Sequence, residues 1–241
     1  MQKIRLDQAV VKKGLTATRS QAETYIKLGK TKVDGKVIAK PGFLVSEQAA
    51  IEVTAKEQYV SRAGLKLASI AEQFHIDFRD KTVLDVGSST GGFTDYALQH
   101  GAKKSIAVDV GTNQLHPTLR TNSRIELHEQ TDIREFAVSE PIDIVVIDVS
   151  FISLRQILPT VKKMSSPNTI ILAMVKPQFE AVANNVKHKG VIKNDRMRRN
   201  ILKNFELWAS QNFVIKDKAD SGIAGEKGNL ERFYYLMVAK A

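Results

Sequence analysis

The sequence predicts an α/β protein with a mostly parallel, seven-stranded sheet covered by helices, preceded by a small α+β module. Three observations support this fold class. From Thr82 onward, short apolar runs alternate with helical patterns, which is typical of a parallel sheet. A glycine-rich turn at residues 87–92 connects the first of these runs to a helix. The first sixty residues instead combine short helical patterns with a hairpin signal.

The N-terminal module is predicted to contain two helices, a hairpin and a further strand. Helical spacing of apolar residues covers residues 4–13 and 18–28, and a glycine, which commonly ends a helix, follows each stretch. An Asp-Gly pair predicts the turn of a hairpin over residues 32–38, and residues 50–53 predict a strand.

Positive charge is concentrated in this module. The chain has a net charge of +10, which favours a polyanionic partner. Residues 1–60 hold 11 Lys and Arg against 6 Asp and Glu, a net of +5, and the remaining residues hold 25 against 20, also +5. The first quarter of the chain thus carries half of the excess charge, and we expect the polyanion to contact it there.

A short polar stretch separates the module from the rest of the chain. We expect one domain at residues 1–57 and a second at 62–241, joined by a linker at 58–61. The second domain is predicted to begin with a helix over residues 62–74.

The second domain carries the alternating pattern. Apolar runs predict seven strands, at residues 82–87, 105–110, 124–128, 143–149, 169–175, 213–219 and 232–239. Helices are predicted at residues 92–100, 152–164 and 195–211. The last two strands have no helix between them, so we expect that they pair antiparallel.

The turn after the first of these strands has the features of a cofactor cradle. Its glycines permit a tight turn, and the N–H groups at the start of the following helix are free to bind a ligand. The turn lacks the G-x-G-x-x-G dinucleotide fingerprint and the Lys-[Ser/Thr] of a P-loop. Asp85 lies near the end of its strand, where it could meet a cationic group. Asp109 ends the next strand, where it could accept hydrogen bonds from a ribose diol.

An ordinary tight turn is the alternative, but two acids at strand ends favour a positive ligand without phosphates, such as S-adenosyl-L-methionine (SAM). The residues predicted to bind it lie in the turn and after the neighbouring strands: Asp85, Gly87, Ser88, Ser89, Thr90, Gly91, Gly92, Phe93, Asp109 and, for the adenine end, Asp132.

Charged residues also follow two other buried strands. Asp148 comes directly after an apolar run, and Lys176 comes directly after another. A charge in such a position is costly unless it is solvated or paired, so both are candidates for the active site. Lys66 and Glu231, considered alone, fit a solvated helix residue and a charge at the start of a strand.

Motifs of the second domain resemble those of the FtsJ-like, SAM-dependent ribose 2′-O-methyltransferases. The matching stretches are Y-V-S-R-A-G-L-K-L at 59–67, L-D-V-G-S-S-T-G-G-F-T at 84–94, V-D-V-G at 108–111, I-D-V-S-F-I-S-L at 147–154, M-V-K-P-Q-F-E at 174–180 and G-N-L-E-R-F at 228–233. The resemblance implies a Rossmann-like methyltransferase domain with a catalytic tetrad of Lys66, Asp148, Lys176 and Glu231. The segment S-G-I-A-G at 221–225 departs from the S-P-[IL]-x-G of that family.

The N-terminal module resembles the ribosomal-protein S-four-like (αL) RNA-binding domain through R-L-D at 5–7, T-R-S-Q-A at 18–22, I-K-L-G-K at 26–30 and V-D-G at 33–35. The two domains together resemble the TlyA (hemolysin A) family of rRNA methyltransferases. This resemblance implies ribosomal RNA and ribosomal subunits as partners and a cytidine ribose as the target. The residues expected to bind RNA are Arg5, Lys12, Lys13, Arg19, Lys27, Lys30 and Lys32.

The tetrad suits the implied reaction. A ribose 2′-hydroxyl is a weak nucleophile at neutral pH and must lose its proton as it attacks a methyl group. A lysine can take that proton only in its neutral form. We expect Lys176 to lie nearest the hydroxyl, with Lys66 and Asp148 positioning it and with Asp148 and Glu231 limiting the total positive charge.

Composition argues against several other classes. The chain has no cysteine, so it has no disulfide framework and no thiolate site. We expect a cytoplasmic protein, because the sequence shows no apolar signal-peptide core and no apolar stretch long enough to span a membrane. No ligand cluster suggests a metal. Two alternatives to the methyltransferase stay open: a hemolysin-like membrane-lytic protein and a non-catalytic RNA-binding protein.

Overall fold

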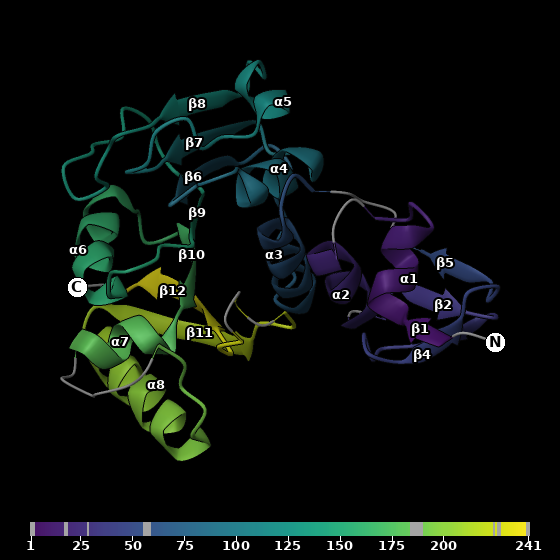
Figure 1. The fold of residues 1–241 in the computed structure, drawn as a ribbon. Coiled ribbons are helices and arrows are strands. Elements are labelled where there is room, and N and C mark those ends of the chain that lie inside the picture. Colours follow the sequence, from purple (N-terminus) through teal and green to yellow (C-terminus); the bar gives the residue numbers. More distant parts are fainter. Residues whose placement is uncertain are drawn as a thin grey trace. The chain divides into compact units, whose positions relative to one another are not determined.

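The computed structural model describes residues 3–16, 19–27, 29–54, 59–183, 190–223, 225 and 228–239. The chain forms two compact units, Met1–Arg62 and Ala63–Ala241 (Figure 1). Of the predicted linker at 58–61, residue 58 lies outside the described residues, as do residues 18 and 28 at the ends of the second predicted helix.

The first unit packs two short helices against two small sheets. Its elements are β1 (Lys3–Arg5), α1 (Leu6–Lys12), α2 (Arg19–Lys27), β2 (Thr31–Val33), β3 (Lys36–Val37), β4 (Leu44–Ser46) and β5 (Ile51–Val53). β1 pairs with β4, and the other sheet has the order β3-β2-β5. Leu6, Val10 and Ile26 from the helices are fully buried against the apolar side chains of the strands, which gives this unit a core of its own.

The start of the first helix differs from the prediction. Ile4 and Arg5 belong to β1, and the helix begins at Leu6. The reason is a long-range pairing: Ile4 lies opposite Val45 in an antiparallel ladder. A strand of three residues is too short to show alternation in the sequence, so neither β1 nor its partner β4 was predicted.

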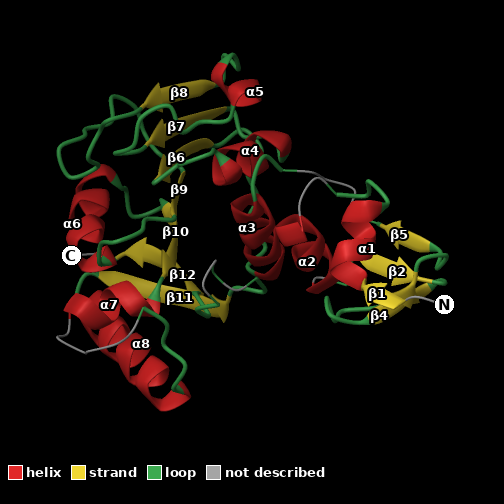
Figure 2. Ribbon diagram, viewed as in Figure 1, coloured by secondary structure: helices red, strands yellow, loops and turns green. Residues whose placement is uncertain are grey.

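The second unit contains the predicted seven-stranded sheet with helices on both faces (Figure 2). Its elements are α3 (Arg62–Gln73), β6 (Thr82–Val86), α4 (Gly92–Gln99), β7 (Lys104–Val108), α5 (Pro117–Arg120), β8 (Ile125–His128), β9 (Ile144–Ile147), α6 (Leu154–Met164), β10 (Ile170–Val175), α7 (Pro177–Ala183), α8 (Asp195–Ala209), β11 (Phe213–Asp220) and β12 (Arg232–Val238). The predicted mostly parallel sheet is confirmed, and only the short helices α5 and α7 were not predicted.

The strand order brings distant residues to one edge of the sheet. The order is β11-β12-β10-β9-β6-β7-β8. β6 to β10 run parallel, whereas β12 runs antiparallel to β10 with Arg232 opposite Val175. The residue before β12 therefore lies at the same edge as the residue after β10.

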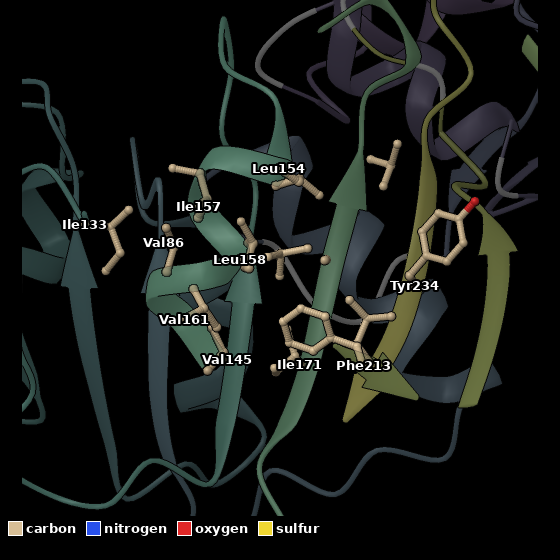
Figure 3. Close-up of a cluster of buried hydrophobic side chains, with 14 of the residues drawn as sticks. Val86, Ile133, Val145, Leu154, Ile157, Leu158, Val161, Ile171, Phe213 and Tyr234 are labelled. Carbon is tan, nitrogen blue, oxygen red and sulfur yellow. The ribbon is translucent and has the colours of Figure 1, made fainter. Parts of the chain in front are cut away.

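The core holds this edge in place. On one face, α6 directs Leu154, Ile157, Leu158 and Val161 toward the strands (Figure 3), and all four are buried. Alternate residues of β12 face the two sides. Tyr234 packs on Phe205 of α8 on this face. Phe233 packs on Phe93 of α4 on the opposite face.

Candidate active site

The glycine-rich turn follows β6 at the carboxyl edge of the sheet. Gly87 has a φ of 78° and Gly91 a φ of 88°, a region that favours glycine. A Cβ at position 87 would lie 2.8 Å from the backbone oxygen of Asp148. Because backbone cannot yield as a flexible side chain does, position 87 requires glycine. The turn is thereby pressed against the end of β9.

This turn presents unpaired donors. Among the residues that the structure describes, the backbone N–H groups of Thr90, Gly92 and Phe93 have no hydrogen-bond acceptor. The hydroxyl of Ser88 is buried and likewise has no partner within this part of the chain. Unpaired N–H groups at the N-terminus of a helix attract acceptors and negative charge, so the turn is suited to hold a carboxylate.

Asp109 lies beside the turn and is partly exposed. Its Oδ2 accepts a hydrogen bond from Ser89 N at 2.8 Å, and its Oδ1 accepts one from Gly111 N at 2.7 Å. A carboxylate oxygen has two lone pairs, so each oxygen can accept a further bond from a ligand. The next residue, Val110, is 71% exposed and adds an apolar surface.

Asp85 lies near the end of β6, as expected, and is held by the first turn of α4. It is fully buried, and its Oδ2 accepts hydrogen bonds from Thr94 N at 2.9 Å and Thr94 Oγ1 at 2.7 Å. Burial raises the pKa of Asp85 to about 7, although the hydrogen bonds from Thr94 oppose this. The side chain supports the start of α4, and its Oδ1 has no hydrogen-bond partner among the described residues, so the predicted contact of Asp85 with the cofactor stays a prediction.

Asp132, the candidate for an adenine contact, follows β8 and is engaged with a neighbour. Arg134 donates from its backbone N to Oδ1 at 2.9 Å and from Nη2 to Oδ2 at 2.5 Å. The side-chain hydrogen bond from Arg134 lowers the pKa of Asp132. The Asp132 side chain keeps 28% exposure.

The four tetrad residues form two ion pairs. Lys176 Nζ, directly after β10, lies 2.7 Å from Asp148 Oδ1, directly after β9. Lys66 Nζ in α3 lies 2.5 Å from Glu231 Oε2, directly before β12. The Lys66 and Glu231 side chains are only 11% and 4% exposed, so each offsets the cost of burying the other.

The segment before Glu231 closes tightly on this second pair. A Cβ at position 225 would lie 2.6 Å from Glu231 Oε1. The Glu231 backbone oxygen also accepts a hydrogen bond from Ser221 N at 2.9 Å. Ala224, within the stretch 221–225 that departs from the family pattern, lies outside the described residues.

The residues between Asp148 and α6 were not singled out from the sequence. Lys176 Nζ donates a hydrogen bond to Ser150 Oγ at 2.7 Å. Phe151 has a φ of 67° and is 90% exposed, and its ring lies 5.3 Å from that of Phe179. Ser150 and Phe151 lie in the matched stretch 147–154, and Phe179 lies in the matched stretch 174–180. Nothing in these motifs distinguishes the three residues from their neighbours.

The predicted RNA-binding residues of the first unit differ in their pairing. Buried Asp7 accepts hydrogen bonds from Arg5 Nη2 at 2.8 Å and Arg19 Nε at 2.9 Å. Burial tends to raise the pKa of Asp7, but these hydrogen bonds outweigh burial and lower it to about 2. Lys12 pairs with Glu47. Within the described residues, Lys13, Lys27, Lys30 and Lys32 have no ion-pair partner.

Two features are absent from the part of the chain that the structure describes. No group of three or more His, Asp or Glu side chains there could hold a metal ion. None of its helices combines the length and apolar character that crossing a bilayer requires.

Comparison with known proteins assigns each unit to a family model. Residues 59–238 match the FtsJ-like methyltransferase model, and residues 4–51 match the S4 domain.

Three of the similar proteins align with most of this chain. The 23S rRNA (cytidine-2′-O)-methyltransferase TlyA of Campylobacter jejuni is 44% identical over 75% of this chain and 72% of its own length. The 16S/23S rRNA (cytidine-2′-O)-methyltransferase TlyA of Mycobacterium tuberculosis is 35% identical over 96% of this chain and 89% of its own. Hemolysin A of Brachyspira hyodysenteriae is 38% identical over 98% of this chain and 100% of its own.

The burial of Asp85 predicts a specific pH dependence of stability. Its pKa in the folded state, about 7, lies above the ordinary value of 3.8. The unfolded chain therefore ionises first as the pH rises, and stability falls between about pH 4 and pH 7. Asp85→Asn keeps an acceptor for Thr94 and does not ionise. The difference in free energy of unfolding between this variant and wild type should shift in favour of the variant as the pH rises from 5 to 7, by up to about 1.4 kcal/mol per pH unit.

Urea unfolding at both pH values measures this difference. Asp80→Asn, which removes an exposed carboxylate, is the matched control. A constant difference between Asp85→Asn and wild type would show that the carboxyl is not held in its neutral form.

Proposed function

The chain belongs to the FtsJ-like methyltransferases, in the TlyA/hemolysin A branch with an N-terminal S4 domain, and on this basis we propose that it methylates a ribose 2′-hydroxyl of ribosomal RNA, using SAM as the methyl donor. The proposed target is a cytidine, because the two TlyA relatives are named for that nucleoside. The proposed place of action is the cytoplasm, where ribosomes are found.

The observation that carries this proposal is the pair of lysine–carboxylate contacts at the edge of the sheet. Lys176 lies 2.7 Å from Asp148, and Asp148 in turn lies against the glycine turn at Gly87. The proposed general base is therefore close to the turn whose N–H groups have no acceptor among the described residues. A structural role alone would not require a lysine at the end of a buried strand, where a charge is costly.

The cradle fits SAM by the chemistry of its donors and acceptors. The free N–H groups of Thr90, Gly92 and Phe93 suit the carboxylate of the methionine part. Asp109 has lone pairs for the ribose hydroxyls, and exposed Val110 offers an apolar surface for the adenine ring. When bound, SAM supplies an electrophilic methyl group on a sulfonium.

The tetrad then has a defined task. In its neutral form, Lys176 accepts the proton of the 2′-hydroxyl while the oxygen forms its bond to the methyl carbon and the carbon–sulfur bond breaks. Asp148 holds the amine in place during this transfer and stabilises the ammonium that results. The Lys66–Glu231 pair lies at the same edge, and we assign it the positioning of the substrate and of the first pair.

The exposed side chain of Phe151 is a further argument that the substrate is RNA. Phe151 is 90% exposed, and its backbone has a left-handed φ. Both features are unfavourable for a large apolar residue. Phe151 directly follows Ser150, a hydrogen-bond partner of Lys176, so it lies close to the candidate site. Exposed aromatic side chains stack on unpaired RNA bases. We propose that this ring contacts a base of the substrate.

The relative named Hemolysin A provides an alternative, membrane lysis. Release of a trapped dye from liposomes distinguishes it from the proposed function. Lysis at protein concentrations that give no methyl transfer would favour the alternative.

Lys176→Ala should lower the single-turnover rate of methyl transfer by about 100-fold or more, because the proton acceptor is lost. Lys176→Arg should fail as well, since a guanidinium stays protonated. The affinities for SAM and RNA should stay close to wild type in both variants. Recovery of the rate by arginine, with RNA binding weakened only in alanine, would instead identify a phosphate contact.

Asp109→Ala should weaken SAM binding at least tenfold, because it removes the proposed acceptors of the ribose hydroxyls and the hydrogen bonds that hold Ser89 and Gly111. Calorimetric titration with SAM measures the affinity, and circular dichroism checks the fold. Asp80→Ala, an exposed position, is the control. An unchanged affinity in Asp109→Ala would place the cofactor elsewhere.

The first unit should supply electrostatic RNA affinity. Replacing Lys13 and Lys30 by alanine removes two exposed charges that have no ion-pair partner among the described residues. The plot of log K against log salt should become shallower by about 0.7–0.9 per lost phosphate contact. The control removes the same charge from the second unit by replacing exposed Lys103 and Lys216. Equal effects of the two double variants would contradict a preferred role for the first unit.

A further inference from the structure

We propose that Ser150 is a positioning residue for Lys176: its hydroxyl accepts a hydrogen bond that fixes the rotation of the amine, which Asp148 holds by charge, and thereby limits where the amine can meet the ribose hydroxyl. This inference rests on the proposed function and adds to it a residue outside the tetrad. Ser150 lies two positions after Asp148, in the loop that joins β9 to α6.

Lys176 Nζ has two close contacts of different kinds. The nitrogen lies 2.7 Å from Asp148 Oδ1 and 2.7 Å from Ser150 Oγ, and the described residues provide no other partner. The contact with Ser150 is a hydrogen bond, whereas the contact with Asp148 is an ion pair without hydrogen-bond geometry, so it attracts the amine without fixing its rotation. A tetrahedral amine bonded to Cε has three further positions, and once one N–H donates to Ser150 the lone pair of the neutral amine is confined to the other two. The proton of the 2′-hydroxyl must arrive at one of these.

With Asp148 alone, the rotation of the amine would not be fixed. The amine could rotate about its Cε–Nζ bond and keep one contact to the carboxylate while the lone pair pointed elsewhere. A second partner at a fixed angle limits that freedom. Holding a reacting group in its productive orientation before the reaction lowers the entropic part of the barrier.

The loop that carries Ser150 is anchored at both ends. At its start, Asp148 N donates a hydrogen bond to Val86 O at 3.0 Å. At its end, Glu180 Oε2 accepts a hydrogen bond from Ser153 Oγ and Oε1 accepts one from Leu154 N, both at 2.7 Å. Glu180 is buried, with 1% exposure.

Lys176 and Glu180 both bond to this loop from the same stretch of chain. They lie four residues apart, at the start of α7 and within it. The position of Ser150 relative to Lys176 is thus set by a second contact between the same two segments. These anchors also explain how Phe151 can keep a φ of 67°, a backbone conformation that is unfavourable for residues other than glycine.

Ser150 itself is exposed. Its hydroxyl would be satisfied by water without Lys176, and the core does not depend on it. Replacement of this side chain therefore tests the chemistry without disturbing the fold.

The experiment compares Ser150→Ala with Ser150→Thr in single-turnover methyl transfer from labelled SAM to unmodified rRNA. Ser150→Ala should lower the maximal rate about tenfold or more, with the affinities for SAM and RNA within twofold of wild type. Ser150→Thr, which keeps a hydroxyl, should recover most of the rate. Ser210→Ala, which removes an exposed hydroxyl at the end of α8, is the matched control and should match wild type.

A double variant tests whether Ser150 acts through Lys176. In the Lys176→Ala background, Ser150→Ala should cause no further loss, because the group that it positions is absent. A wild-type rate in Ser150→Ala, or equal losses in alanine and threonine, would overturn the role of Ser150 alone. Absence of transfer by the wild-type protein would overturn the proposed function, and this inference with it.

Discussion

The candidate site depends on one constraint: an ammonium or carboxylate that leaves water must find a partner of opposite charge. Lys66 and Glu231 are 165 residues apart in the chain and almost fully buried. Removing either partner would leave an unpaired charge, which is strongly destabilising. β12 lies antiparallel beside β10, with Arg232 opposite Val175. This pairing places Glu231, the residue before β12, where it can meet Lys66. Glu231 and Lys176 are thereby brought to one edge of the sheet.

The same edge links the cofactor cradle to the proposed base. Asp148 donates its backbone N–H to Val86, and its carbonyl lies where a side chain at position 87 would collide. The glycine turn and the Lys176–Asp148 pair are therefore built on neighbouring, hydrogen-bonded strands. Much of the rate of a methyl transfer comes from in-line positioning, and we propose that this packing contributes to it.

The sequence predicted the sheet because its signals are local, whereas the tetrad as a set was implied by the family resemblance. A buried parallel strand is a continuous apolar run, and a charge directly after such a run is conspicuous, as for Asp148 and Lys176. The rest depends on distant contacts. β1 forms through its pairing with β4, and the hydrogen bonds that hold Asp85 come from Thr94, nine residues further along the chain. The proposed roles of Ser150 and Phe151 depend on the conformation of the loop between β9 and α6, and Glu180 of α7 anchors the end of that loop.

The most direct test of the account is to incubate the purified protein with labelled SAM and ribosomal subunits that lack ribose methylation, and then to map the label. The account predicts stoichiometric transfer to a ribose 2′-oxygen of rRNA, at a cytidine, visible as resistance of the adjoining phosphodiester to alkaline cleavage. Label on a base or on ribosomal protein, or no label despite SAM binding, would contradict it.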